Sequence, residues 1–299
     1  MTNSPDVIVN AMSVDVEDYF QVSAFEPHIP AASWADLPAR VERNTRLALD
    51  LFGRHGVRAT FFVLGWVAER YPDLVREIVR GGHELASHGF SHVRVIRQTP
   101  AQFREDVGRT KALLEDIGGV EVAGYRAASY SIGRDNLWAL DVLQTVGHRY
   151  SSSIYPIRHD LYGMPEAPRF PFRYRETGIL EIPITTINLF GRNLPGGGGG
   201  YFRLLPYRAS RWAIRRVNRV DARPAVFYFH PWELDPEQPR PAGLGLKTRV
   251  RHYLNLGRMQ ARLVRLLGDF RWDRMDRVFL GAEPAAAASG EVRREAAAR

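Results

Sequence analysis

The chain has 299 residues, 45% of them hydrophobic, which is enough to bury the core of one large α/β domain or of two small ones. The sequence contains no cysteine, so disulfides and thiolate metal ligands are excluded and any metal site must use His, Asp or Glu. Its formal net charge of +8 comes mostly from arginines spread along the chain, with no recognised nucleic-acid-binding motif, so we expect no nucleic-acid partner.

Short apolar runs alternate with helical patterns from the N-terminus onward, which is typical of βαβ units with a mainly parallel sheet. Helices are predicted at residues 41–52 and 74–80, the second ending at a Gly81-Gly82 cap. Strands are predicted at residues 7–14, 59–64, 83–87, 121–125, 149–152, 179–184 and 225–230. This alternation favours a (β/α) barrel over an open sheet.

Two later segments interrupt the pattern. Residues 194–200 (LPGGGGG) contain five consecutive glycines and should not hold a regular element. A plain mobile loop is the favoured interpretation, and a close approach of the backbone to another group is the alternative. Residues 281–299 are rich in Ala, Gly, Glu and Arg with almost no large apolar residues, which predicts a disordered tail.

The N-terminal residues lack a basic segment followed by an apolar one, and no run of about 18 apolar residues occurs. We therefore expect neither a signal peptide nor a membrane span, and a cytoplasmic location. The basic stretch 208–223 predicts a helix with Trp212, Ile214 and Val217 on its apolar side. A solvated helix face is the favoured interpretation of its arginines, with contact to an anionic polymer or to the inner face of the membrane as the alternative.

Acidic residues cluster at the end of the first predicted strand, in the segment SVDVEDYF (residues 13–20). Alternation along a strand directs Asp15 and Glu17 to one side and Val14 and Val16 to the other. The C-terminal ends of barrel strands open onto the active-site face, so two carboxylates would be aimed at one point. The competing interpretation is that one aspartate caps the following turn.

Two histidines follow the third predicted strand, in the segment SHGFSH (residues 87–92). On a helical turn, the spacing of His88 and His92 would place both imidazoles on one face, as two nitrogen ligands of a divalent ion require. The motif is weak alone. Together with a carboxylate from the neighbouring strand it predicts a site of two histidines and one carboxylate.

Two further strand ends carry charged or titratable residues. Arg126 lies where GYRAASYS (124–131) leaves its strand, and it could hold an acidic base in position. His230 ends the aromatic strand of FYFHPWE (227–233), where it is well placed as a general acid. A core histidine bonded to the backbone is the alternative for His230 considered alone.

Taken in order, these four motifs resemble those of the polysaccharide deacetylases, the family 4 carbohydrate esterases with a NodB homology domain. The segments VDVEDYFQVSAFE, HELASHGFSH, GYRAASYSI and FYFHPWELDPEQPR look most like the branch found in bacterial exopolysaccharide gene clusters, including those associated with exosortase. That branch has a C-terminal extension, which residues 244–274 resemble.

The resemblance implies an α/β protein with a distorted (β/α)7 barrel of the NodB type, a single domain over residues 1–280 whose helical extension begins at about residue 240. It also implies a divalent metal, with zinc favoured. Residue by residue, Asp15 matches the catalytic base and Arg126 the residue that orients it, and His230 matches the general acid. His88 and His92 match the metal histidines. The backbone N–H near Ser129 would help to hold the oxyanion.

Three departures from the family pattern bear on the site. The family usually has two adjacent aspartates, whereas here Val16 separates Asp15 from Glu17. Alternation favours Glu17 as the metal carboxylate, and acid type favours Asp18. Ala128 replaces a usual proline, which removes no functional group. Residues 150–153 (YSSS) have serine where an aspartate would support the catalytic histidine, which leaves the partner of His230 open.

The function implied is removal of N-acetyl groups from N-acetylhexosamine units of an exopolysaccharide or a lipid-linked precursor, with Trp232 and Tyr201 as candidates for stacking on sugar rings. One alternative keeps the barrel and metal but acts on a cyclic imide or another non-peptide amide. A second alternative is a non-catalytic carbohydrate-binding relative, which predicts loss of the base or acid. Both Asp15 and His230 are present.

Overall fold

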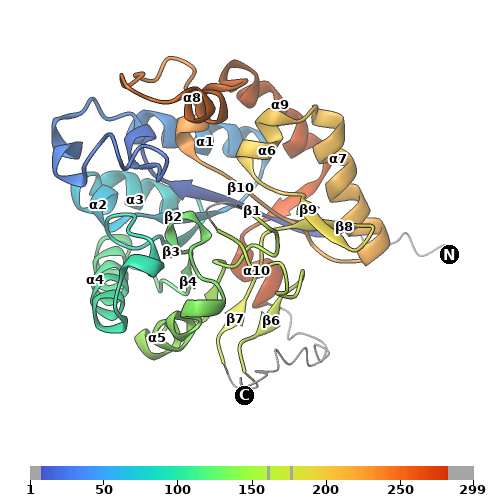
Figure 1. Cartoon of the computed structure of the whole chain (residues 1–299), viewed down its shortest axis with the longest axis horizontal. Helices are drawn as coiled ribbons and strands as arrows, with labels where there is room; N and C mark the ends of the chain where they lie inside the picture. The colour runs from blue at the N-terminus through green and yellow to red at the C-terminus, as the bar shows by residue number, and fades with distance from the viewer. Residues whose placement is uncertain (1–7, 160–161, 176–177, 282–299) are drawn as a thin grey trace, which may run out of the picture.

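The computed structural model describes residues 8–159, 162–175 and 178–281 (Figure 1). The predicted tail therefore lies outside the described residues except for Gly281. Within these ranges, no helix combines the length and apolar character that a membrane span requires.

The strands form one large curled sheet and a small hairpin. The large sheet has nine strands in the order β10-β1-β2-β3-β4-β5-β7-β6, with β11 paired to β1 off this path. All pairs are parallel except β6 with β7. The strands are β1 (Val9–Val16), β2 (Thr60–Val63), β3 (Glu84–Ser87), β4 (Gly124–Tyr125), β5 (Tyr150–Ser151), β6 (Phe172–Arg173), β7 (Leu180–Glu181), β8 (Thr186–Leu189), β9 (Arg192–Pro195), β10 (Val226–Phe229) and β11 (Arg271–Asp273).

Helices cover the outside of this sheet, with α1 to α5 following the strands in βα order (Figure 1). The chain then adds α6 to α9 along the top and right of the view, and α10 lies near its centre, below β1 and above β7 (Figure 1). The helices are α1 (Val41–His55), α2 (Gly65–Arg70), α3 (Pro72–Arg80), α4 (Pro100–Gly118), α5 (Trp138–Val146), α6 (Gly199–Leu204), α7 (Tyr207–Arg216), α8 (Leu246–Tyr253), α9 (Leu256–Asp269) and α10 (Met275–Phe279).

The sequence of β1 explains how the core divides into two layers. Met12, Val14 and Val16 belong to the cluster that packs against the helices, whereas Ala11 belongs to the cluster inside the curled sheet. Ser13 and Asp15 lie between the residues that face the helices, and both accept hydrogen bonds from Arg126 inside the sheet. Alternation therefore sends the polar members of an otherwise apolar strand to the inside, where the functional groups gather.

The C-terminal part of the chain completes the sheet and closes one of its ends. β10 pairs with β1 over the register Ala11↔Val226 to Val14↔Phe229. At the start of α10, the backbone N–H of Met275 donates to Thr60 Oγ1 at 2.8 Å, and that of Asp276 donates to Glu84 Oε2 at 3.1 Å. Since Thr60 and Glu84 begin β2 and β3, α10 covers the N-terminal ends of these strands and leaves their C-terminal ends for the site.

All seven predicted strands are found, although several are short, and β6, β8, β9 and β11 were not predicted. The architecture agrees with the predicted distorted (β/α)7 barrel. Its sheet is incomplete, because β10 and β6 end the strand order without pairing to each other in the described part of the chain.

The prediction for residues 194–200 was wrong. β9 extends to Pro195 and α6 begins at Gly199, so only Gly196 to Gly198 lie outside regular elements. A Cβ on Gly197 would lie 2.3 Å from the carbonyl oxygen of Val226, so the segment packs closely against β10. The alternative of close backbone approach is the correct interpretation.

The basic helix is found where it was predicted, but one of the three residues predicted for its apolar side is not buried. α7 covers most of the predicted stretch and continues as a single π-turn over Val217–Asp221. Ile214 and Val217 are buried as expected, but Trp212 is 48% exposed. Trp212 therefore lies on the outer face of α7.

Candidate metal centre and active site

Asp15 and Arg126 form a buried ion pair at the end of β1. Arg126 Nη1 donates to Asp15 Oδ1 at 2.5 Å and to Ser13 Oγ at 2.9 Å, and the guanidinium also contacts Ser152. Burial lowers the pKa of Arg126, but Asp15 and the neighbouring tyrosines together offset this and hold it above its usual value. The second carboxylate oxygen, Oδ2, lies 3.5 Å from the Tyr130 hydroxyl and 3.9 Å from His230 Nε2. One oxygen of Asp15 is thus held by the arginine and the other faces the site.

Glu17, His88 and His92 form the group of potential metal ligands. One ligand atom from each lies within 4.8 Å of the other two. His92 Nε2 is 2.9 Å from Glu17 Oε2. Although burial raises the pKa of Glu17, the neighbouring His92 and His230 hold it well below its usual range, so the carboxylate is ionised.

The donor set fits a divalent cation. Glu17 Oε2 is buried and receives no hydrogen bond of good geometry from any described residue. His88 Nδ1 lies 2.7 Å from the carbonyl oxygen of Arg126, which can only accept, so Nδ1 carries the proton and Nε2 keeps a lone pair. Burial lowers the pKa of His88 to about 4, which keeps the imidazole neutral. Two histidines and a carboxylate match the ligands that zinc and similar ions take, and the His88 contact is the usual outer support of such a ligand.

The two histidines do not share a helical turn, so that part of the prediction was wrong. Residues 88–92 form a loop after β3, and the imidazole centroids are 5.2 Å apart. Gly89 has a φ of +75° and His92 a φ of +53°. The loop turns back through these left-handed residues and brings His92 to Glu17.

Asp18 is not placed with the metal group, contrary to the alternative based on acid type. Its carboxylate accepts from the backbone N–H of Tyr19 at 2.8 Å, Arg40 at 2.6 Å and Val41 at 2.9 Å. It thereby caps the short turn Tyr19–Gln21 and holds the start of α1. The capping interpretation considered for this acidic cluster is correct for Asp18, and Glu17 is the carboxylate that joins the histidines.

His230 lies near Asp15 and Glu17, directly after β10. Its Nε2 is 3.5 Å from Glu17 Oε1, and its Nδ1 is 2.8 Å from Glu233 Oε1. Burial alone would lower the pKa of His230, but Glu17 and Glu233 raise it to about 9. The structure therefore supplies the partner that the sequence left open. The signal was present as a glutamate three residues after the histidine.

Trp232 is not placed to stack on a sugar ring, contrary to the prediction. It is 6% exposed and its ring lies between His230, with centroids 5.1 Å apart, and His252, with centroids 4.2 Å apart. Its Nε1–H donates to Glu17 Oε1 at 3.2 Å. Both ring faces are occupied, so Trp232 supports Glu17 and His230 instead of a substrate. Tyr201 is partly buried in α6.

Ser129 belongs to the short 3-10 turn Ala128–Tyr130 that follows β4. It has a φ of +51°, and its Oγ lies 2.7 Å from Ser23 Oγ. The next residue, Tyr130, brings its hydroxyl to Asp15 Oδ2. The strained turn thus sits beside the carboxylate, where a backbone N–H could face a reacting group.

Comparison with known families accounts for both halves of the chain. Residues 30–151 match the family model described as polysaccharide deacetylase. This part of the chain is similar to the polysaccharide deacetylase family. Residues 152–280 match a second model, described as a domain of unknown function, DUF3473. His230 and Glu233 fall in this second part, whereas Arg126, His88 and His92 fall in the first, and Asp15 and Glu17 precede both.

Curated relatives of this family match over short stretches. A peptidoglycan-N-acetylglucosamine deacetylase from Bacillus cereus is 34% identical over 71 residues, which are 24% of this chain and 26% of that protein. A chitooligosaccharide deacetylase from Bradyrhizobium sp. is 33% identical over 97 residues, 32% of this chain and 42% of that protein. The chain thus spans about a quarter to two fifths of the length of these relatives.

The fold extends over nearly the whole molecule in a solved structure. A crystal structure from Mycobacterium smegmatis, of a protein provisionally named a polysaccharide deacetylase, superposes with a TM-score of 0.61. It covers 93% of this chain and 91% of that chain at 20% sequence identity. The predicted distorted (β/α)7 fold is therefore confirmed.

Proposed function

We propose that the chain is a metal-dependent polysaccharide N-deacetylase that hydrolyses N-acetyl groups on N-acetylhexosamine units of an exopolysaccharide or its precursor. The observation that carries the proposal is the convergence of Asp15, the Glu17-His88-His92 group and His230 at the C-terminal ends of β1, β3 and β10. The family and the deacetylase relatives support the reaction class. The exopolysaccharide substrate rests on the resemblance of the four motifs to that branch.

The residues have complementary roles in amide hydrolysis. Asp15, with one oxygen held by Arg126, takes a proton from the attacking water on its other oxygen. His230 gives a proton from Nε2 to the leaving amine, since its Nδ1 side is occupied by Glu233. The backbone N–H of Ser129 faces the oxyanion of the tetrahedral intermediate.

Glu17, His88 and His92 would hold the metal, and zinc suits their donor atoms best. When bound, such a cation polarises the acetyl carbonyl and lowers the pKa of a water molecule. Trp232 keeps Glu17 aligned through its Nε1–H. The chain's own contribution is therefore to fix the ligands, orient the base and place the acid.

The experiment that tests this proposal compares substrate classes on purified zinc-loaded protein. We expect acetate release from N-acetylglucosamine oligomers, with kcat/KM increasing with chain length, and no opening of a cyclic imide. Imide opening without acetate release would favour the alternative hydrolase. Binding of oligomers with neither reaction would favour a carbohydrate-binding relative.

We further propose that the enzyme acts in the cytoplasm at the inner face of the membrane, where it would meet a lipid-linked oligosaccharide. The outer face of α7 supports this, because the half-exposed Trp212 lies one turn from Arg208 and Arg215. Basic residues around an exposed aromatic ring are typical of helices that bind anionic lipid surfaces. Arg211 is paired with Asp269 at 2.8 Å, so it is less available for such a contact.

Charge reversal on α7 and on the π-turn that follows it is expected to remove this association. Wild type should sediment with vesicles containing phosphatidylglycerol and not with pure phosphatidylcholine, while the double variant Arg208→Glu with Arg219→Glu should stay in solution. Both arginines are exposed. Arg80→Glu with Arg104→Glu, on α3 and α4, is the charge-matched control and should still sediment. Equal behaviour of the two double variants, or no binding by wild type, would remove the membrane proposal.

A further inference from the structure

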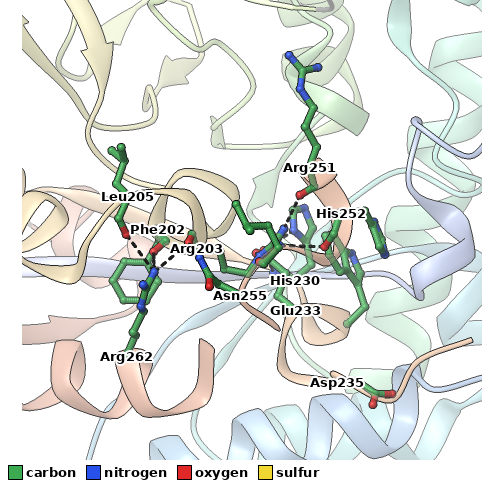
Figure 2. A network of polar contacts seen from close by, with 12 residues as sticks. Phe202, Arg203, Leu205, His230, Glu233, Asp235, Arg251, His252, Asn255 and Arg262 are labelled. Carbon is green, nitrogen blue, oxygen red and sulfur yellow. Dashed lines mark hydrogen bonds and ion pairs between the residues drawn. The ribbon is translucent and has the colours of Figure 1, made fainter. Parts of the chain in front are cut away.

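The carboxylate of Glu233 is held rigidly against the backbone and ring of His230 (Figure 2). Its Oε1 accepts from His230 Nδ1 at 2.8 Å and from the His230 backbone N–H at 3.1 Å. Its Oε2 accepts from Arg203 Nε at 2.6 Å. The side chain of Glu233 is fully buried, so both oxygens have fixed protein partners and no competing solvent.

Arg203 has no freedom to move away from this carboxylate. Its guanidinium donates to the carbonyl oxygens of His252 and Leu254, both at 2.9 Å, and of Arg251 at 3.3 Å (Figure 2). These carbonyls belong to α8 and the turn after it. A buried ion pair is costly to desolvate, and here three of the four remaining N–H donors are satisfied by backbone carbonyls. Although burial would raise the pKa of Glu233, Arg203 and His230 lower it to about 2.

The glycine run gives this carboxylate its space. A Cβ on Gly199 would lie 2.0 Å from Glu233 Oε1 and 2.4 Å from Oε2, so no other residue fits at this position. Gly199 is the first residue of α6, which also carries Arg203 one turn later. The same short helix therefore provides both the clearance and the cation for Glu233. A Cβ added to its neighbour, Gly200, would meet nothing within 4 Å, so that position is not constrained in this way.

Serine occupies the position where the family resemblance leads one to expect an aspartate that supports the catalytic histidine. Ser152 Oγ accepts from Arg126 Nη2 at 3.0 Å, and Ser153 Oγ accepts from the backbone N–H of Ala127 at 2.9 Å. Both serines thus serve the arginine loop. An ionised carboxylate can only accept a hydrogen bond, so Glu233 keeps a proton on His230 Nδ1 and leaves Nε2 to the reacting groups.

We infer that Glu233 is the positioning residue for His230, that Arg203 and Gly199 hold it in place, and that residues 152–280 supply this unit to the active site. The inference rests on the proposed function for the role of His230 as the acid, and it deepens that function. It assigns a task to the part of the chain that matches the domain of unknown function. The chain before residue 152 provides the base and the metal ligands, and residues 152–280 provide the acid and its orientation.

The test uses Glu233→Gln and Gly199→Ala in the zinc-loaded full chain. Outer residues that orient a catalytic or ligating imidazole contribute about 10–100-fold to activity, so we expect kcat to fall by about this factor with KM changed less than twofold. In ¹⁵N NMR, wild-type His230 should carry a protected proton on Nδ1, assigned by its absence from His230→Gln. Both variants should lose that protection. Gly200→Ala is the matched control and should keep the wild-type kcat and Nδ1 signal.

The NMR readout separates this inference from the proposed function. If wild type releases no acetate but Nδ1 is protonated and loses protection in both variants, the positioning arrangement stands and the proposed reaction fails. If wild-type His230 is protonated on Nε2 alone, or if either folded variant keeps the wild-type Nδ1 signal, the inference is overturned. Gly199→Ala removes no polar group and acts only by displacing the Glu233 carboxylate, so its effect does not depend on how glutamine is accommodated.

Discussion

Replacing Asp15 by asparagine is expected to reduce acetate release by about 10²–10⁴-fold, the usual contribution of a general base. The variant keeps the shape of the side chain but removes its charge and basicity. KM should change little, because the oxygen that faces the site contacts Tyr130 and His230 and not a substrate-binding surface. The measurement is steady-state acetate release from N-acetylglucosamine oligomers.

The same substitution is expected to lower the free energy of unfolding by about 3–5 kcal/mol, the cost of leaving a buried charge without its partner. Arg126 is fully buried and would face a neutral amide. Replacing Arg126 by methionine in the Asp15→Asn background should restore part of the stability, because no buried charge remains, and none of the activity. Urea unfolding of wild type and the two variants checks this. If Asp15→Asn alone were as stable as wild type, the Asp15–Arg126 ion pair would not have the predicted role in stability.

Replacing Glu17 by glutamine is expected to raise the Kd for zinc. Loss of a residue that only supports a metal ligand typically weakens binding by about 10–100-fold, and loss of a ligand should weaken it more. The wild type should gain stability with zinc, by about 2.7 kcal/mol when free zinc is at 100 times its Kd. Glu17→Gln should gain little, since its amide is a poor ligand beside His88 and His92. Titration calorimetry and thermal unfolding with and without zinc measure both effects.

Asp18→Asn is the matched control, one residue along the chain. We expect it to bind zinc with the wild-type Kd and to lose about 1–3 kcal/mol of stability, because both oxygens of Asp18 accept from backbone N–H groups and an amide nitrogen in place of either oxygen cannot accept. Loss of zinc binding in Asp18→Asn with retention in Glu17→Gln would show that the carboxylates have been assigned in the wrong order.

The sequence predicted the elements whose signal is local and strong. β1, β2 and β10 are buried apolar runs, and α1 ends at Gly56 in the left-handed conformation. Asp15 and Glu17 were placed on one side by strand alternation. β6, β8, β9 and β11 were missed because none of them is a fully buried apolar run: each has partly buried or exposed residues.

The predictions that failed depend on long-range packing. Whether the glycine run is mobile is decided by Val226 and Glu233, which lie more than twenty residues away and approach its backbone closely. Trp232 looked available because aromatic rings after a strand often bind sugars, but its two faces are covered by histidines from β10 and α8. Arg203 carries no local motif, so its contact with Glu233 was invisible without the fold.

The central claim is tested most directly by acetate release from N-acetylglucosamine oligomers with wild type and Asp15→Asn, each as prepared, after chelation and after zinc is restored. The account predicts release by wild type that is lost on chelation and recovered with zinc, and at most trace release by Asp15→Asn in every condition. Wild-type release that survives complete removal of metal, or equal release by Asp15→Asn, would contradict it.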